Sequence, residues 1–363
     1  MANAIQLMNY GAPYPGNFMR SMLALERALE SAGSTCVFVL PASAERFDWV
    51  NELRQAGKKI FFATGGVVKD ARLLVSLVER YRIDVLHSHF ASAGMLLAVR
   101  LARLAWPEVG WVAHVHNHEQ GRSRLKNLLK RTLVAADRYV GVSEHVRADL
   151  LARGYDPRKC VSVPNAVDFS RLDGAAAAPV RDGRKKVLMF GFDFERKGVD
   201  IALEALSRHD SGHEMLLMIV LAANFDAVRS RIERMFGRVP AWVELLPPTD
   251  NVATYYRMAD VFISPSREEG LPYALIEAAY CGLRLVASDI GGQTGLGIPG
   301  LAHFKSEDPR GLYDALQAEN SSPAPARDYV VKRFRLEKWV RDILGLYAGL
   351  PSRGGALPRY RTP

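Results

Sequence analysis

Two glutamates in the second half of the chain, Glu269 and Glu277, are separated by seven residues. Glu269 lies in a loop after an apolar run, and Pro272 suits the first turn of a helix, so that Glu277 projects from this helix. Amides at the start of a helix bind anions such as phosphate. The pattern favours a nucleotide site in which the amides of Leu271, Tyr273 and Ala274 meet phosphate, Glu277 accepts from ribose hydroxyls and Glu269 reaches a sugar. The alternative is an exposed pair without a site.

A second candidate loop, residues 190–198, follows another apolar run and precedes a helical pattern. Arg196 and Lys197 stand there at the mouth of the helix, where cations and the helix dipole together suit a diphosphate. The alternative is a solvated turn with ordinary surface charges.

Histidine is concentrated in one short part of the chain. Residues two apart on a strand share a face, so these imidazoles are expected to converge. Imidazole exchanges protons near neutral pH and orients hydroxyl groups, which favours the edge of an active site. A coincidence of packing is one alternative; a metal site is a weaker one, because no acidic or thiol residue is spaced to complete a ligand set. The five histidines are His87, His89, His114, His116 and His118.

The loop at residues 9–17 follows the first apolar run and ends in Gly16 and Asn17, directly before a helical pattern. Glycine allows a ligand to approach the backbone closely, and the helix start favours an anion. An ordinary strand–helix turn is an equally good interpretation of this segment by itself.

Apolar runs of strand length alternate with amphipathic helical patterns through most of the chain. This alternation predicts an α/β protein with parallel sheets covered by helices on both faces. Such doubly wound sheets bind ligands beyond the carboxyl ends of their strands, which is where the candidate loops fall. The predicted strands are 5–8, 35–40, 59–62, 85–87, 111–116, 139–142 and 160–163, followed by 186–190, 215–221, 243–246, 261–264, 284–287 and 303–305.

A stretch of small residues at 174–179 predicts a linker between two domains. The predicted domains are residues 1–175 and 184–325, and the length of 363 residues fits two cores. Residues 326–349 are expected to form a closing helix that packs back toward the first domain, and residues 350–363 a loose tail.

The net charge of +9 is concentrated in residues 1–180, which carry 23 basic and 16 acidic side chains. This excess indicates an anionic partner, and no motif supports nucleic acid as that partner. Three scattered cysteines argue against a disulfide framework and favour the cytoplasm. The sequence shows neither a signal peptide nor an apolar run long enough to span a membrane.

The segment 121–133 combines five basic side chains with leucines at helical spacing. Such a helix can lie on an anionic membrane, so the protein is expected to be cytoplasmic with a possible peripheral site on the inner face of the membrane. The alternative is a helix whose apolar stripe packs on the sheet.

Residues 266–278, together with 281–282 and 286–292, resemble the donor-site signature of retaining glycosyltransferases of family 4, which have the GT-B fold. Further segments resemble the family in the same order along the chain: 84–89 (Asp-Val-Leu-His-Ser-His), 136–144, 163–168 (Val-Pro-Asn-Ala-Val-Asp) and 191–198. The resemblance spans residues 1–347 and implies two Rossmann-like domains that face a cleft.

The resemblance also implies roles for single residues. Glu269 matches the first glutamate of the pair, which contacts the transferred sugar, and Glu277 matches the second, which binds ribose. Lys197 matches the lysine that holds the diphosphate, and His116 matches the histidine at the sugar, with His114 and His118 as alternatives. The implied catalytic set is His116, Glu269 and Lys197, and the implied donor-binding set is Gly16, Asn17, Arg196, Lys197, Gly270, Leu271, Pro272, Tyr273 and Glu277.

Three positions depart from the family pattern. Phe192 replaces the arginine that normally follows the glycine at 191, and Arg196 is a candidate substitute for it. The first loop has Gly16 preceded by proline in place of two glycines, and Ala166 replaces a glycine. These changes concern phosphate binding more than the fold.

The resemblance implies transfer of a sugar from a UDP- or GDP-sugar to an acceptor hydroxyl with retention, without a metal or other cofactor. The nucleotide-sugar is the co-substrate, and the acceptor is a saccharide, a lipid-linked saccharide or a small glycoside of bacterial polysaccharide or glycolipid synthesis. The alternatives are a nucleotide-sugar 2-epimerase of GT-B shape and a weakly active, transferase-like nucleotide-binding subunit. A nicotinamide enzyme is disfavoured because no Gly-x-Gly-x-x-Gly follows an early strand.

Overall fold

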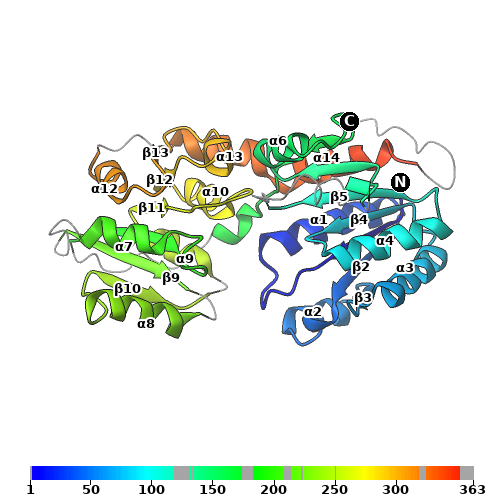
Figure 1. Ribbon diagram of the computed structural model, residues 1–363, viewed down its shortest axis with the longest axis horizontal. Coiled ribbons are helices and arrows are strands. Elements are labelled where there is room, and N and C mark those ends of the chain that lie inside the picture. Colours follow the sequence, from blue (N-terminus) through cyan, green and yellow to red (C-terminus); the bar gives the residue numbers. More distant parts are fainter. Residues whose placement is uncertain are drawn as a thin grey trace. The chain divides into compact units, whose positions relative to one another are not determined.

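The computed structural model describes residues 2–117, 131–132, 134–173, 183–207, 214–221, 224–249, 251–318 and 324–351. These residues form two compact units (Figure 1). The first unit contains residues 1–166 and 336–363, and the second contains residues 167–335. Most of the segment 121–133, the linker 174–179 and nearly all of the tail 350–363 lie outside the described residues.

The first unit is built on a parallel sheet of seven strands in the described chain, in the order β3-β2-β1-β4-β5-β6-β7. The order reverses between β1 and β4, so loops after these two strands border the crevice where such sheets bind ligands. The strands are β1 (Ala4–Met8), β2 (Cys36–Pro41), β3 (Ile60–Ala63), β4 (Val85–His89), β5 (Gly110–Val115), β6 (Arg138–Gly141) and β7 (Cys160–Ser162).

Helices cover both faces of this sheet. Apolar side chains of one face, such as Leu86 and Trp111, pack with α3 and α4, and those of the other face, such as Met8 and Val112, pack with α1 and α14. The helices of this unit are α1 (Gly16–Ser31), α2 (Asp48–Gln55), α3 (Val67–Tyr81), α4 (Ala93–Ala105), α6 (Glu144–Ala152) and α14 (Leu336–Ala348), with the 3-10 turn η1 (Ala42–Ala44).

The second unit repeats the plan with six parallel strands in its described part, in the order β10-β9-β8-β11-β12-β13. Here the order reverses between β8 and β11. The strands are β8 (Lys185–Phe190), β9 (Met215–Val220), β10 (Val243–Leu246), β11 (Val261–Ser264), β12 (Arg284–Ser288) and β13 (Ala302–Phe304). The helices are α7 (Val199–Ser207), α8 (Phe225–Phe236), α9 (Val252–Met258), α10 (Tyr273–Tyr280), α11 (Gly291–Thr294), α12 (Pro309–Gln317) and α13 (Ala324–Phe334), with the 3-10 turn η2 (Phe169–Leu172).

The predicted α/β class with two parallel, Rossmann-like sheets is therefore confirmed. The single closing helix predicted for 326–349 is wrong in one respect: Arg335 separates α13, which packs on α10, from α14, which packs on α1. The expected return of the chain end to the first unit is confirmed for α14 alone, and Figure 1 shows this helix beside the N-terminal elements.

The boundary between the units lies at residues 166 and 167 rather than at 175. The reason is that the segment 167–173 is fastened to the second unit by side-chain contacts. Arg171 pairs with Glu277, and Tyr280 donates to Asp173 at 2.7 Å. A composition-based linker at 174–179 could not reveal these contacts.

Candidate active site

The loops after β8 and β11 bring three predicted residues of the second unit together. The ammonium of Lys197 lies 2.5 Å from Oε1 of Glu269, and the guanidinium of Arg196 lies 3.9 Å from Oε2 of the same carboxylate. Glu269 is buried, and Lys197 is largely covered. Two cations and one carboxylate therefore share a place at the carboxyl edge of the sheet, where its strand order reverses.

Phe192 provides an aromatic surface for both cations. Its ring, 45% exposed, has the Lys197 ammonium 4.6 Å and the Arg196 guanidinium carbon 5.8 Å from its centroid. Cations within about 6 Å of a ring face are attracted to it. The residue that replaces the family arginine thus helps to hold two other cations beside Glu269.

Burial lowers the pKa of Lys197 below its ordinary value, and the charge of Glu269 opposes this shift. The lysine is placed by Gly198, which has φ of +67° and comes so close to the neighbouring loop that a Cβ there would lie 2.0 Å from the carbonyl oxygen of Pro265. Glycine alone fits both requirements. The two loops that flank the reversal of strand order therefore touch through their backbones.

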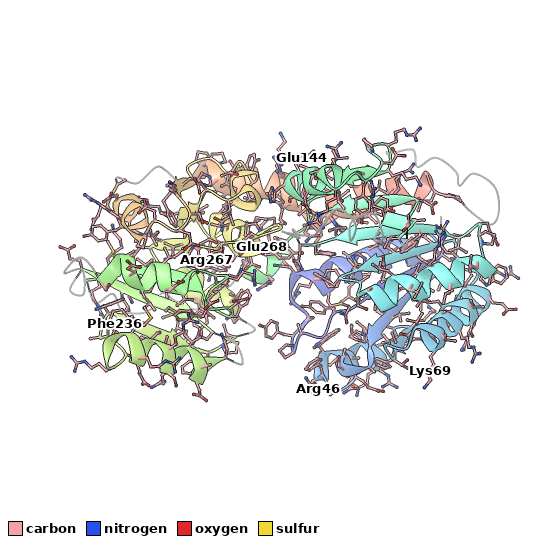
Figure 2. All side chains as sticks on the ribbon, viewed as in Figure 1. Arg46, Lys69, Glu144, Phe236, Arg267 and Glu268 are labelled. Carbon is pink, nitrogen blue, oxygen red and sulfur yellow. The ribbon has the colours of Figure 1, made fainter. Side chains whose placement is uncertain are left out.

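Glu269 is held from several sides. The hydroxyl of Ser266 donates to Oε1 at 2.9 Å, and Gly292 of α11 approaches so closely that a Cβ would lie 1.9 Å from the carbonyl oxygen of Glu269. Arg267, labelled in Figure 2, anchors the same loop by pairing with Asp200 and Glu307. The carboxylate consequently stands in a fixed loop.

Glu277 is also buried and has two partners within the second unit. Its Oε1 accepts from Arg171 at 2.9 Å, and its Oε2 accepts from the hydroxyl of Tyr256 at 2.7 Å. Burial raises the pKa of Tyr256, so its hydroxyl keeps the proton that it donates. The interpretation of the two glutamates as an exposed surface pair is therefore wrong, because both carboxylates are buried and bound by other side chains.

Helix α10 begins at Tyr273, directly after Pro272, so the predicted residues Gly270 and Leu271 lead into its first turn. These residues are buried next to Glu269. The segment from Glu269 to Tyr273 thus combines a carboxylate with a helix start at one edge of the sheet, the arrangement from which an anion site was predicted.

In the first unit, β4 and β5 place four of the five clustered histidines on one buried face. His87 and His89 come from β4, His114 comes from β5, and His116 follows directly. His87 lies 3.1 Å from His114, and His89 lies 3.2 Å from His116, measured between ring nitrogens. The predicted convergence is confirmed for these four, and His118 lies outside the described residues.

His116 contacts the start of the helix that follows the predicted N-terminal loop. Its ring stacks on Phe90 at 3.9 Å between centroids and meets the edge of Phe18 at 5.5 Å. Phe18 follows Gly16 and Asn17 at the start of α1, and Gly16 has φ of +53°, which favours glycine. The structure therefore gathers Gly16, Asn17 and His116 near the reversal of strand order in the first unit.

Ring nitrogens of His87, His89 and His114 lie within 4.8 Å of one another, a spacing compatible with a metal ion. However, five of the six nitrogens in these rings already have hydrogen-bond partners, and Nε2 of His114 is the exception in the described chain. An ion would have to break several of these bonds. The geometry favours a hydrogen-bonded cluster.

Acid should destabilise the first unit through these imidazoles. Burial is the main cause that lowers the pKa of all four, for His114 to about 3. Below the unfolded value of about 6.5, the unfolded chain therefore binds protons that the folded chain does not, and stability falls as pH falls. We therefore expect the free energy of unfolding to be lower at pH 5 than at pH 7. Below pH 6.5, each such histidine should lower it by about 1.4 kcal/mol per pH unit.

Urea denaturation at a series of pH values measures this slope. His114→Gln should reduce it, and His303→Gln, at an exposed position of β13, is the matched control. Equal stability of the wild type at pH 7 and pH 5 would contradict the assignment of buried, neutral imidazoles.

Two family models match the chain in tandem. Glycosyltransferase Family 4 matches residues 20–171, and Glycosyl transferases group 1 matches residues 184–318. The chain belongs to the family 4 glycosyltransferases. The GPI3 subunit of phosphatidylinositol N-acetylglucosaminyltransferase from Saccharomyces cerevisiae is 29% identical over 236 residues, which are 61% of this chain and 51% of the relative. The chain therefore matches about half the length of this curated relative.

Solved structures show the same fold. A glycosyltransferase from Rickettsia africae has a TM-score of 0.80 at 18% identity, covering 95% of this chain and 98% of that one. Anabaena HepE in complex with UDP-glucose has a TM-score of 0.77 at 15% identity, covering 96% of this chain and 100% of the other. The chain accordingly has the GT-B fold.

A buried polar network behind the Glu269 loop was not predicted. Gln293 donates to Ser264 at 2.6 Å, and Ser288 donates to the carbonyl of Ser266. The run 286–292 was recognised as part of the family signature, but no periodicity or charge pattern marks short polar side chains as supports of a loop. They become visible when their burial and partners are known.

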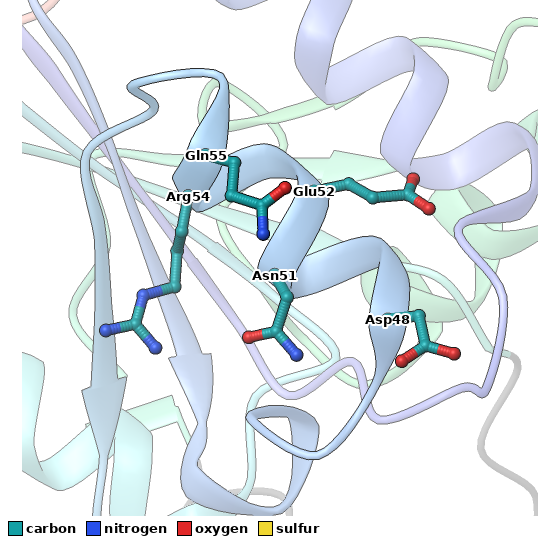
Figure 3. A pocket seen from close by; sticks show the side chains of 5 residues that line it. All are labelled: Asp48, Asn51, Glu52, Arg54 and Gln55. Atoms are coloured by element: carbon teal, nitrogen blue, oxygen red, sulfur yellow. The ribbon is translucent and has the colours of Figure 1, made fainter.

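Other features of the chain contribute less to the definition of the candidate site. Figure 3 shows a depression on α2 whose five lining side chains include none of the predicted site residues. Among the helices in the described ranges, none has the length and apolar character required to cross a membrane. The segment 121–133 is described only at Arg131 and Thr132.

Proposed function

We propose that this glycosyltransferase moves a sugar from a nucleotide-sugar to an acceptor hydroxyl with retention at the anomeric carbon. The observation that carries the proposal is the cluster of Lys197, Arg196 and Glu269 at the reversal of strand order in the second unit. Two cations beside a buried carboxylate suit a diphosphate joined to a sugar. Glu277 lies on the helix that starts from the same loop and supplies a carboxylate for ribose hydroxyls.

The catalytic task in this proposal is electrostatic. As the bond between the anomeric carbon and the diphosphate breaks, negative charge grows on the leaving group, and Lys197, Arg196 and the amides of Gly270, Leu271 and Tyr273 stabilise it. The acceptor oxygen attacks from the same face, and its proton passes to the leaving diphosphate. Glu269 and His116 orient the sugar, while Gly16 and Asn17 border the phosphate and acceptor.

Lys197 and Glu269 form an ion pair. The diphosphate competes with Glu269 for the ammonium, so donor binding releases the carboxylate toward the sugar. Arg196 supplies a second cation. It compensates for the arginine that the family has at the position of Phe192.

A UDP-sugar is the favoured donor in this proposal, supported by the similar fold of HepE, which was solved with UDP-glucose; a GDP-sugar is the second choice. The acceptor is a saccharide, a lipid-linked saccharide or a small glycoside. The likeness to the yeast phosphatidylinositol N-acetylglucosaminyltransferase chain supports an acceptor carried on a lipid.

Incubation of the protein with UDP-glucose in the absence of acceptor tests this function, with proton NMR of the released sugar. Slow hydrolysis that yields α-glucose first supports retention from the α-linked donor. Initial β-glucose would contradict retention, and an epimerised UDP-sugar would identify a 2-epimerase. Neither hydrolysis nor transfer with any UDP- or GDP-sugar would favour the weakly active, nucleotide-binding subunit.

The reaction should proceed without a divalent ion, because Lys197 and Arg196 supply positive charge at the diphosphate. We expect donor turnover in excess EDTA to equal that in magnesium within about twofold. Turnover that disappears in EDTA and returns with magnesium would overturn this prediction.

The predicted membrane contact of segment 121–133, at the inner face of the membrane in the cytoplasm, belongs to the same proposal. Its five basic side chains should bind vesicles of phosphatidylglycerol, and salt should weaken this binding by screening. Sedimentation with vesicles at low and high salt measures it, with pure phosphatidylcholine vesicles as the control. Absence of the protein from the phosphatidylglycerol pellet at low salt would contradict the predicted membrane contact.

A further inference from the structure

One continuous chain of hydrogen bonds runs through the buried histidines of the first unit. It joins strands β1, β4 and β5 to Tyr347 on helix α14, near the other end of the sequence. His89 lies 3.1 Å from the amide oxygen of Gln6, whose amide nitrogen donates to Tyr347 at 2.9 Å; Tyr347 lies 2.7 Å from His87. With the two contacts between histidines, the order is His116, His89, Gln6, Tyr347, His87 and His114.

The amide of Gln6 determines which group donates and which accepts at each of these hydrogen bonds. Its oxygen can only accept, so His89 must donate from Nε2 and accept at Nδ1, because a neutral imidazole has one donor and one acceptor nitrogen. His116 must then donate from Nε2 to His89. The donor and the acceptor of each hydrogen bond between Gln6, His89 and His116 are thereby assigned.

The same reasoning assigns the hydrogen bonds between Tyr347, His87 and His114. Tyr347 accepts from the amide nitrogen of Gln6, and Nδ1 of His87 is the acceptor that the described residues offer to its own hydroxyl proton, so Tyr347 donates to His87. His87 consequently donates from Nε2 to Nδ1 of His114. With the Gln6 amide in this orientation, all four imidazoles carry their proton on Nε2, and burial keeps them uncharged by lowering their pKa.

This network of hydrogen bonds has one other consistent set of donors and acceptors. If the amide of Gln6 turned over, every hydrogen bond would reverse, and all four imidazoles would carry the proton on Nδ1. A mixture of the two directions would place two donors or two lone pairs opposite each other. The orientation of one buried amide is therefore coupled to the tautomer of His116.

We propose that Gln6, whose amide bridges Tyr347 and His89, is a positioning residue that holds His116 as the Nε2–H tautomer. His116 then presents the lone pair of Nδ1, which accepts a hydrogen bond from a hydroxyl group of the sugar or the acceptor. The use of this lone pair rests on the function proposed above, whereas the fixed tautomer does not. Helix α14 acquires a role in the site because it supplies the hydroxyl that accepts from the Gln6 amide nitrogen.

Long-range ¹H–¹⁵N correlation NMR of the protein labelled with ¹⁵N-histidine tests the tautomers directly. The wild type should show Nε2–H forms for all four buried rings. Tyr347→Phe removes the acceptor of the Gln6 amide, so His116 should become a mixture of tautomers, and kcat should fall about tenfold at an unchanged donor KM. Tyr81→Phe, which removes a hydroxyl elsewhere in the first unit, should leave the tautomers and kcat unchanged.

A second variant guards against a simple loss of folding. In Gln6→Glu both carboxylate oxygens accept, so Tyr347 must turn its proton away from His87. His87 and His114 should then change to Nδ1–H while His89 and His116 keep Nε2–H. A structural defect without directional coupling would not separate the two pairs in this way.

Mixed tautomers in the wild type, or a His116 that stays Nε2–H with normal kcat in Tyr347→Phe, would overturn the proposal. Correct tautomers without donor turnover would instead overturn the proposed function, and with it the use of the Nδ1 lone pair, while the network would stand. The spectroscopic and kinetic readouts therefore separate the two failures.

Discussion

Lys197→Ala should lower kcat for donor turnover by about 10²–10³-fold, the usual cost of a lost preorganised group that stabilises developing charge. The ammonium of Lys197 lies 2.5 Å from Glu269 in a largely covered place, so water cannot easily replace it. The melting temperature should change far less, because Glu269 keeps its hydrogen bond from Ser266 and its neighbour Arg196. Steady-state kinetics and thermal melting of the same preparation measure both effects.

The matched control is Lys305→Ala, which removes an exposed lysine of the same unit and should leave kcat unchanged. Lys197→Arg retains a positive charge and should recover part of the lost turnover, although the guanidinium differs in shape from an ammonium. Kinetics of Lys197→Ala equal to those of the wild type would remove this lysine from the site.

Gly292→Ala should lower kcat/KM by about 10²-fold although it adds only one methyl group. The new Cβ would lie 1.9 Å from the carbonyl oxygen of Glu269, so either α11 or the loop that carries the carboxylate must move. Displacement of reacting groups by about 1 Å has an effect of this size. Kinetics together with thermal melting distinguish a displaced loop from an unfolded unit.

Gly345→Ala is the control for this substitution. Gly345 lies within α14, and a Cβ there meets no atom within 4 Å. Alanine is favoured over glycine inside a helix by about 0.5–1 kcal/mol, so this variant should be slightly more stable and fully active. If Gly292→Ala were equally harmless, the close approach of α11 to Glu269 would have no part in catalysis.

The sequence predicted the parts of the fold that depend on local patterns. Apolar runs and helical periodicity identified the strands that flank both reversals of order, and the candidate loops follow those strands. The break at Arg335 escaped prediction because helical patterns continue on both sides of it, whereas the division of α13 from α14 is fixed by which unit each helix packs against.

Prediction of the candidate site was limited by partners that lie far apart along the chain. Residue type and spacing selected Lys197 and Glu269, but not their ion pair. The contact of Glu277 with Arg171 spans 106 positions, and that of Gln6 with Tyr347 spans 341. No motif links such residues, and the burial that keeps the histidines neutral depends on the packing of α14 over the sheet.

Binding of intact nucleotide-sugars to the wild type and to Lys197→Ala tests the central claim most directly, by thermal shift with UDP-, GDP- and dTDP-sugars. A donor at one hundred times its Kd adds about 2.7 kcal/mol of stability, which corresponds to about 5–10 °C for a unit of this size. We expect one nucleotide class to raise the wild-type melting temperature by this amount, and the rise to be largely lost in Lys197→Ala. No shift with any nucleotide-sugar, or equal shifts in both proteins, would contradict the account.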